Sequence, residues 1–192
     1  VQTGDVVLRA RALDVSPNQI RTDAFQELIT TMIETMRAAP GVGLAAPQIG
    51  IPMQVIVLED REDLLAKLPE ADRALRERIP FKTRVFVNPV LRFVGDEKRT
   101  FFEGCLSVDG YVALVERSRE VEVVGVDEHG AEQTWQVRGW PARILQHEVD
   151  HLNGTLYVDR MESRSFSTVA NATKFYAGKS IAEVRELLGT NH

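Results

Sequence analysis

The stretch PARILQHEVDHL, residues 141–152, is the segment around which the rest of the fold can be placed. Pro141 suits the first turn of a helix and Asn153–Gly154 is a typical end signal, so we expect a helix over this stretch. Three apolar residues repeat at helical spacing, namely Leu145, Val149 and Leu152. The sequence therefore predicts a helix that turns one face toward a hydrophobic core and keeps a separate polar face.

The polar face carries His147 and His151, with Glu148 directly after the first histidine. An α-helix has about 3.6 residues per turn, so positions four apart lie almost one above the other and two imidazoles can reach one metal ion. Glu148 is offset by about 100° and points beside such an ion, where a general base has to sit. The spacing predicts a metal site with a neighbouring base; the alternative is a polar helix surface with no such role.

A catalytic metal site usually has three protein ligands and one open position, so we expect a third ligand. The downstream candidates have no flanking sequence that marks them: Glu162, Glu183, Glu186 and His192. Upstream lies Cys105, the only cysteine, although a lone cysteine is more often a small buried apolar residue. Gly104 frees the backbone at a strand edge, and Glu103 is disfavoured in a plain core strand. We therefore favour a Cys-His-His set, which suits iron, zinc or cobalt.

Two regular elements are expected on either side of a glycine-rich segment near the start of the chain. Apolar residues at helical spacing predict a helix over 23–38, which Thr22 or Asp23 can cap and Pro40–Gly41 can end. MQVIVLED, residues 53–60, has the composition of a strand. The charged stretch 61–79 is interpreted as a solvated insertion without chemistry of its own.

The segment between them, GVGLAAPQIG at residues 41–50, is predicted to be a loop with tight backbone geometry. Gly41 and Gly43 would let the backbone of a substrate approach closely. Gln48 would offer a side-chain amide as a donor.

The middle of the chain is mostly β-rich. Residues 84–94 predict two short strands broken at Asn88–Pro89, and residues 111–138 predict three strands, the last two joined by a turn. After the histidine helix we expect a strand over 155–161 and a final helix over 180–189, which starts with a capping box. The predicted fold class is α+β, with antiparallel or mixed sheets packed around a central metal-binding helix and with N- and C-terminal helices.

Size and charge exclude several classes of protein. The 192 residues suit a single domain over 1–192, and the net charge of −5 gives no basic patch for nucleic acid. No apolar run approaches the roughly 20 residues that a membrane helix needs. A single cysteine excludes an internal disulfide and is consistent with a reducing compartment.

Three motifs occur in a specific order, GVGLAAPQ (41–48), EGCLS (103–107) and QHEVDHLNG (146–154). Their combination closely resembles the signature of the peptide deformylases and is much more specific than any one motif. The resemblance runs from Gly4–Leu8, which is similar to the family's N-terminal strand region, to Met161. FFEGCLSVDGY and GWPARILQHEVDHLNG look most like the type 1 branch found in organelles and in some bacteria.

The resemblance implies removal of the formyl group from an N-terminal formyl-methionine. The positions that match the family's metal ligands are Cys105, His147 and His151. Glu148 matches the general acid/base, which serves the attack of a metal-bound hydroxide on the formyl carbon. Gln48 matches the side chain that donates to the substrate oxyanion, together with the backbone N–H of Leu106. The implied native ion is Fe(2+), with Zn(2+), Ni(2+) or Co(2+) as substitutes in preparations.

The resemblance also implies a pocket for the methionine side chain. Gly43, beside Gly41, matches the loop position whose backbone meets the substrate. The positions around the methionine pocket correspond to Val42, Phe101, Glu103, Trp140, Arg143 and Ile144. Many bacterial members have Pro and then a basic residue soon after EGCLS, where this chain has VDGYVALV. We assign the rim beyond the methionine to Tyr111 and Val112.

The expected partners are N-formyl-methionyl nascent peptides and, transiently, the ribosome, with no direct contact to nucleic acid or membrane. We expect a monomer or weak dimer in the bacterial cytoplasm, or in the mitochondrial matrix or plastid stroma if the source is eukaryotic. Two other functions fit the helix motif. A zinc endopeptidase would have a third ligand other than cysteine, and a non-enzymatic metal-binding module would have a closed fourth position.

Overall fold

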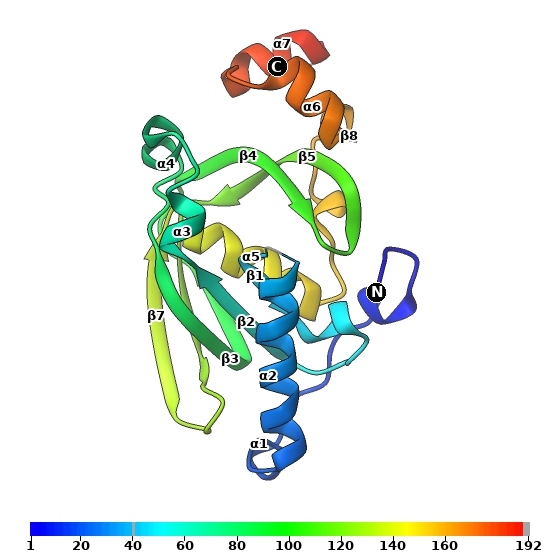
Figure 1. Ribbon diagram of the computed structural model, residues 1–192, viewed down its shortest axis with the longest axis vertical. Coiled ribbons are helices and arrows are strands. Elements are labelled where there is room, and N and C mark those ends of the chain that lie inside the picture. Colours follow the sequence, from blue (N-terminus) through cyan, green and yellow to red (C-terminus); the bar gives the residue numbers. More distant parts are fainter. Residues whose placement is uncertain (40, 190–192) are drawn as a thin grey trace.

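The computed structural model describes residues 1–39 and 41–189, and in this part of the chain the strands form two antiparallel sheets (Figure 1). The larger sheet has the order β1 (Gly43–Ala45), β2 (Val55–Asp60), β3 (Phe81–Phe93), β6 (Glu120–Val126) and β7 (Glu132–Arg138). The smaller sheet has the order β4 (Lys98–Cys105), β5 (Val108–Ser118) and β8 (Ser167–Thr168). The three strands predicted within 111–138 are thereby confirmed.

Helix α5 (Trp140–Leu152) lies between the two sheets and contacts strands of both (Figure 1). Leu145 and Leu152 are fully buried, and Val149 packs against the same core at partial exposure. Because both flanks of the helix are covered, its polar face points into the protein rather than into bulk water. The predicted α+β class with a central helix is confirmed.

Helix α2 (Asp23–Ala38) covers β1 and β2 and forms a second core with them. The predicted cap is present, because the Thr22 hydroxyl accepts a hydrogen bond from the Phe25 N–H at 3.2 Å. Pro40, predicted to help end this helix, lies outside the described residues. Short helix α1 (Pro17–Ile20) precedes α2.

The strand implied near Gly4–Leu8 is wrong, because residues Val6–Arg9 form the 3-10 helix η1. The Asp5 carboxylate accepts from the Val7 N–H at 3.1 Å, and a local bond of this kind favours a turn over an extended strand. The glycine-rich segment is also more regular than a loop. It forms strand β1 and then the 3-10 helix η2 (Ala46–Ile49).

The break predicted at Asn88–Pro89 does not end a strand. Strand β3 continues through it, and the register with β6 shifts between Val87 and Val90. Asn88 has a φ of 51°, and its side chain bonds to both the N–H and the carbonyl of Val15, each at 2.8 Å. The irregularity is therefore a bulge that ties β3 to the N-terminal segment.

The strand predicted over 155–161 is wrong as well. Residues Tyr157–Asp159 form the 3-10 helix η3, with only an isolated bridge between Met161 and Val115. The Asp159 carboxylate accepts from the Leu156 N–H at 2.8 Å and stabilises the turn. The prediction of a strand relied on the β-branched and aromatic residues of this stretch, which do not prevent a turn.

The stretch 61–79 is not simply a solvated insertion. It contains helices α3 (Glu62–Leu65) and α4 (Glu70–Leu75), and the Leu65 side chain is fully buried. Arg78 forms a two-pronged ion pair with buried Asp60, at 2.7 and 2.9 Å. Charge content alone suggested a solvated surface, whereas these contacts attach the stretch to the sheet.

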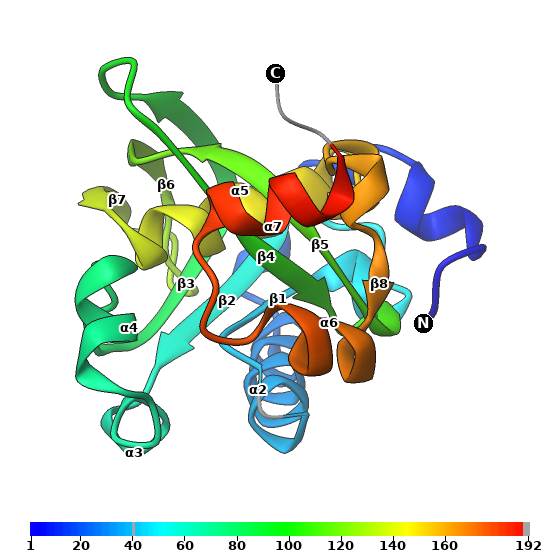
Figure 2. The same cartoon turned by 90° about the horizontal axis from the view of Figure 1, so that it is seen from above.

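The C-terminal part runs through η4 (Ser163–Ser165) and β8 into α6 (Val169–Tyr176) and α7 (Ile181–Leu188), which lie over the β4–β5 end of the molecule (Figure 2). The predicted capping box of α7 is confirmed, since Ser180 and Glu183 bond reciprocally. Within residues 1–39 and 41–189, no helix has both the length and the apolarity to cross a bilayer.

Candidate metal and active site

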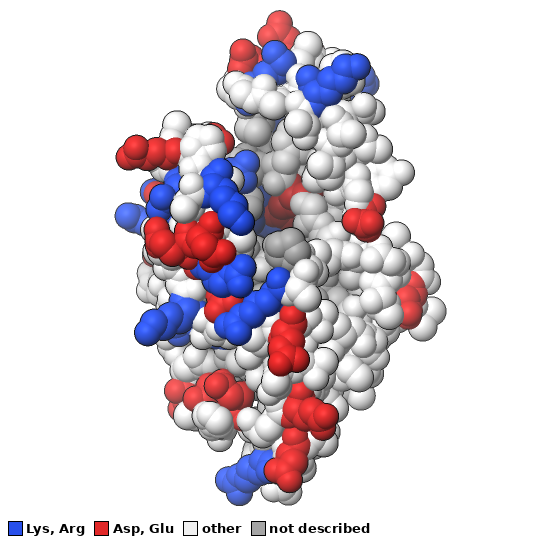
Figure 3. Space-filling view, in the orientation of Figure 1, with Lys and Arg blue, Asp and Glu red and all other residues white. Residues whose placement is uncertain are grey.

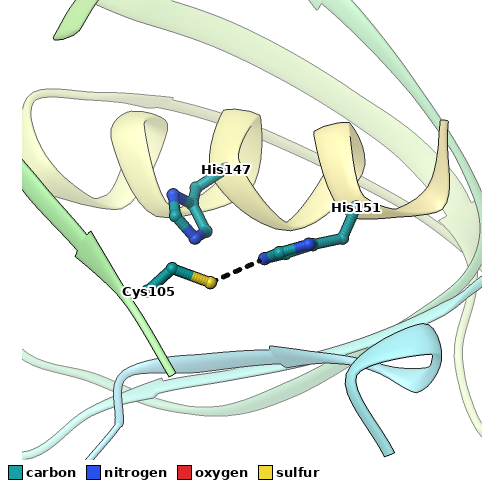
Figure 4. Close-up of side chains that lie close together, drawn as sticks. All are labelled: Cys105, His147 and His151. Carbon is teal, nitrogen blue, oxygen red and sulfur yellow. Dashed lines mark hydrogen bonds between the residues drawn. The ribbon is translucent and has the colours of Figure 1, made fainter. Parts of the chain in front are cut away.

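Three side chains with metal-ligating atoms meet where the end of β4 faces α5 (Figure 4). One donor atom from each of Cys105, His147 and His151 lies within 4.8 Å of the others. The Cys105 sulfur is 3.3 Å from Nε2 of His151, and the two imidazole centroids are 5.0 Å apart. A soft thiolate and two imidazoles in this arrangement fit a single transition-metal ion. Spacing placed the histidines on one helix face, and the fold brings the cysteine opposite them.

Glu103 orients the first histidine. Its carboxylate accepts from Nδ1 of His147 at 3.1 Å, which leaves Nε2 of that ring for a metal. Burial would raise the pKa of Glu103, but hydrogen bonds from His147 and Arg117 outweigh burial and hold the pKa well below its ordinary value. Glu103 was expected in the methionine pocket; it lines the cavity, and it also supports a candidate ligand from behind.

A chain of buried charges continues from Glu103 to the surface. Arg117 on β5 donates to both oxygens of Glu103, at 3.0 and 2.9 Å, and also pairs with Asp150 on α5. Asp150 in turn accepts two bonds from Arg160, at 2.6 and 2.7 Å. Arg143 donates to Glu103 from the other side. These ion pairs fix the sheet and the helix in one register around the site.

Glu148 is buried beside the histidines and lines the cavity. Burial raises the pKa of this carboxyl to about 7, and its Oε2 has no hydrogen-bond partner among the described residues. Gly43 explains how the carboxylate fits. A Cβ on Gly43 would lie only 2.4 Å from Oε1 of Glu148, so any larger residue at this position would force the carboxylate to move. A carboxyl with a pKa near neutrality, buried and unpaired next to a metal-ligating set, is suited to accept and return a proton.

Gln48 reaches the same point from η2. Its Oε1 accepts from the Ala45 N–H at 2.9 Å, so its amide Nε2 is directed toward the site, 3.6 Å from the Cys105 sulfur and 3.4 Å from the Ser107 hydroxyl. The Ser107 N–H also donates to the Cys105 sulfur at 3.4 Å. Leu106 follows Cys105 and lines the same cavity. Ser107, in the turn between β4 and β5, was not predicted as a site residue although it belongs to the EGCLS motif.

A cavity of about 390 Å³ opens over these groups. Its walls include most of the predicted substrate-binding residues: Gly41, Val42, Gly43, Glu103, Tyr111, Val112, Trp140, Arg143 and Ile144. Phe101 is the exception. The neighbouring Phe102 lines the cavity, whereas Phe101 lies behind the wall with its ring 6.1 Å from that of Trp140.

The alternative third ligands lie elsewhere. Glu162 pairs with Arg185, and Glu183 caps α7 through Ser180. Glu186 is not in the cluster of donor atoms, and His192 lies outside the described residues. Several cavity residues were missed, namely Phe102, Gly104, Val108, Asp109, Gly110, Val169 and Arg76, the last from the stretch interpreted as a solvated insertion. Only long-range packing brings Arg76 to the cavity, so no local signal could have identified it.

Two histidines and a buried glutamate on one helix, with a cysteine on a facing strand, form a candidate metal site of the His-Glu-x-x-His class. The family model of polypeptide deformylase matches residues 1–167. The chain belongs to this family.

Relatives and solved structures agree with this assignment. Peptide deformylase 1A of Arabidopsis thaliana, named as chloroplastic and mitochondrial, is 51% identical over 171 residues, covering 89% of this chain and 64% of the plant protein. The chain thus spans less than two thirds of that relative's length. Peptide deformylase 1 of Streptomyces coelicolor is 43% identical over 189 residues, covering 98% of this chain and 84% of that protein. Relatives are therefore both bacterial and organellar, and either location fits.

The structure of a class I type b peptide deformylase from Acinetobacter baumannii with bound Met-Ala-Ser is similar, with a TM-score of 0.74. It is 35% identical in sequence, and the match covers 84% of this chain and 96% of that one. The fold and the three sequence motifs thus point to one family.

Proposed function

We propose that this protein hydrolyses the formyl amide of N-formyl-methionyl peptides. Its substrates are the N-termini of newly made proteins. The observation that carries the proposal is the cluster of Cys105, His147 and His151 donor atoms at a cavity that Cys105, His147, Glu148 and Gln48 line. Family membership supports the reaction class. The Met-Ala-Ser peptide in the Acinetobacter relative supports the substrate class, since this tripeptide is what remains when formyl is removed from formyl-Met-Ala-Ser.

The donor set fits a divalent metal, and we propose Fe(2+) as the native ion, with Zn(2+), Ni(2+) or Co(2+) able to replace it. When bound, such an ion would act as a Lewis acid and lower the pKa of a water molecule. Glu103 holds His147 in the tautomer that presents Nε2. An unpaired polar atom also supports the fit. Oε2 of Glu148 is buried and has no hydrogen-bond partner among the described residues.

Glu148 serves as the proton carrier. Its carboxylate takes the proton of the attacking water and then returns that proton to the amine of the leaving methionine. A pKa of about 7 suits both halves of this task at neutral pH, because the group is neither a very weak base nor a very weak acid. Gly43 keeps the carboxylate in place by leaving room for it.

Gln48 and the backbone N–H of Leu106 stabilise the negative charge that develops on the formyl oxygen. The Ala45 N–H holds the carbonyl end of the Gln48 side chain, so the donating Nε2 does not have to reorganise during the reaction. Each donor of this kind contributes roughly 3–4 kcal/mol to the transition state in enzymes that have been measured.

The substrate binds as an extended strand along β1. β1 is the edge strand of the larger sheet, and its far side borders the cavity, where Gly41 and Gly43 allow a close backbone approach. The methionine side chain then enters between Val42, Trp140 and Ile144. A formyl group carries only hydrogen beyond its carbonyl, so a narrow cavity excludes larger acyl groups.

The test is to incubate the protein, loaded separately with iron or nickel, with formyl-Met-Ala-Ser and with casein, while metal content is measured. We expect formate release from the peptide and no internal cleavage of casein. Casein cleavage would favour the zinc endopeptidase alternative. A protein that binds metal stoichiometrically but acts on neither substrate would favour the binding module. Ribosome contact and a monomeric or weakly dimeric state remain predictions.

A further inference from the structure

A positively charged side chain stands at the cavity without a role in the reaction described above. Arg76 is the C-cap residue of α4, and it lines the same cavity as the candidate metal ligands. Its guanidinium carbon lies 4.8 Å from the centroid of the Trp140 ring and 5.8 Å from that of Phe101. Stacking on two aromatic rings holds a long and otherwise flexible side chain in one place at the cavity wall.

Arg76 differs from the other arginines near Trp140. Arg143 and Arg78 also lie within 6 Å of that ring, at 5.8 and 5.6 Å. Arg143 is paired with Glu103, and Arg78 is paired with Asp60. Within residues 1–39 and 41–189, no carboxylate forms an ion pair with Arg76. Lys and Arg side chains accordingly gather along one side of the hollow in the middle of the molecular face (Figure 3).

The state of Arg76 is what a binding site for an anion requires. Burial lowers the pKa of its guanidinium, with a weaker opposing effect of Asp72. The guanidinium is thus partly desolvated, and no carboxylate of the described residues neutralises its charge. A substrate carboxylate would offset the cost of desolvation by forming a bidentate ion pair with it. The acid on the other wall, Asp109, lines the cavity too, but it does not pair with Arg76.

The position of Arg76 selects one side chain of the peptide. In an extended strand, residues one and three point to the same side and lie about 7 Å apart. In the proposed binding mode the first side chain packs against Trp140, which lines the cavity and on which Arg76 stacks. The third side chain is therefore the one that emerges beside Arg76, and the second points away.

We propose that Arg76 binds a carboxylate side chain at the third residue of the substrate, so that the enzyme favours peptides with Asp or Glu at this position. The inference rests on the proposed deformylation and on the extended binding of the peptide along β1. It adds a specificity-determining residue outside the three motifs.

The test compares kcat/KM for formyl-Met-Ala-Asp with that for formyl-Met-Ala-Asn, using nickel-loaded protein, and repeats the pair with Asp and Asn at the second position. We expect a preference for the acid of about fivefold at position three and little at position two. The preference should fall as salt is added. Arg76→Gln should abolish the Asp-to-Asn ratio, Arg76→Glu should invert it, and Arg76→Lys should keep part of it.

Arg73→Gln is the matched control, because Arg73 lies on the same helix but does not line the cavity. This variant should keep the wild-type ratio. Affinities of the product peptides Met-Ala-Asp and Met-Ala-Asn, measured by calorimetry, give a readout that does not depend on turnover. Melting temperatures show that each variant is folded.

Equal kcat/KM values for the Asp and Asn peptides in the wild type would overturn the inference, as would a ratio that survives in folded Arg76→Gln. A preference confined to position two would overturn the assigned position. Failure of the wild type to release formate from either peptide would instead count against the proposed function, so the two failures can be told apart.

Discussion

Replacing Gly43 by alanine should disable the site without removing any functional group. The new Cβ would stand 2.4 Å from Oε1, 2.8 Å from Cδ and 2.9 Å from Cγ of Glu148, whereas ordinary contact begins at 3.4 Å. The carboxylate would have to retreat by about 1 Å, since 3.4 minus 2.4 is 1.0. Glu148 is buried and lines the cavity, so the carboxylate can retreat only into the cavity, away from its present position. A misplacement of this size can cost about 100-fold in rate.

We therefore expect kcat of Gly43→Ala on formyl-Met-Ala-Ser to fall about 100-fold, with metal content unchanged. Overpacking should also lower the free energy of unfolding by about 1–3 kcal/mol, which a thermal melt would detect. The matched control is Gly41→Ala, whose Cβ would meet the Leu106 Cδ1 atom at 3.2 Å. Leu106 is partly exposed and can rotate, so kcat should change much less, whereas KM should rise because Gly41 borders the substrate path. A Gly43→Ala enzyme with wild-type kcat would refute the claim that this glycine positions the base.

Four further results are expected. Glu148→Gln should keep stoichiometric metal and the fold but lose most turnover; loss of the metal as well would identify Glu148 as a ligand. Gln48→Leu should lower kcat and kcat/KM together by about 10²–10³-fold, whereas a raised KM with intact kcat would mean that Gln48 only holds the glycine segment. Glu103→Gln should weaken metal binding by about 10–100-fold in a chelator competition because the acceptor of His147 loses its negative charge; unchanged affinity would contradict that role. The iron form should lose activity in air faster than the nickel or zinc form because Cys105 would be an iron-bound thiolate, and equal half-lives would argue against iron at Cys105.

Local patterns were enough for the parts of the fold that depend on local interactions. Helices α2, α5 and α7 follow from apolar spacing and from caps such as Thr22 and Ser180. The pairing of His147 with His151, and the separate direction of Glu148, follow from helix geometry alone. These features depend only on residues within a few helical turns of each other, so they can be predicted from the sequence alone.

Other features depend on partners far along the chain. Asn88 stays inside β3 because its side chain bonds to Val15, 73 positions away, and no local rule anticipates such a bond. Cys105 became a candidate through its flanking residues and the family resemblance, since spacing could not relate it to a helix 46 positions downstream. Arg76 and Arg117 were missed for the same reason, because ion pairs and stacking across the fold decide where their side chains lie.

The charged chain through Arg117 and Asp150 has a consequence for how the protein matures. The candidate metal-ligating atoms come from β4 and α5, which Glu103 joins through His147 and Arg143, and Arg117 of β5 adds a further link by pairing with both Glu103 and Asp150. Until the small sheet docks on the helix, the two histidines of a nascent chain lie far from the cysteine thiol. The three donor atoms then bind a metal ion only weakly. Metal capture should thus be a late event in biogenesis, which spares the unfinished chain from binding the wrong metal through loose cysteine and histidine side chains.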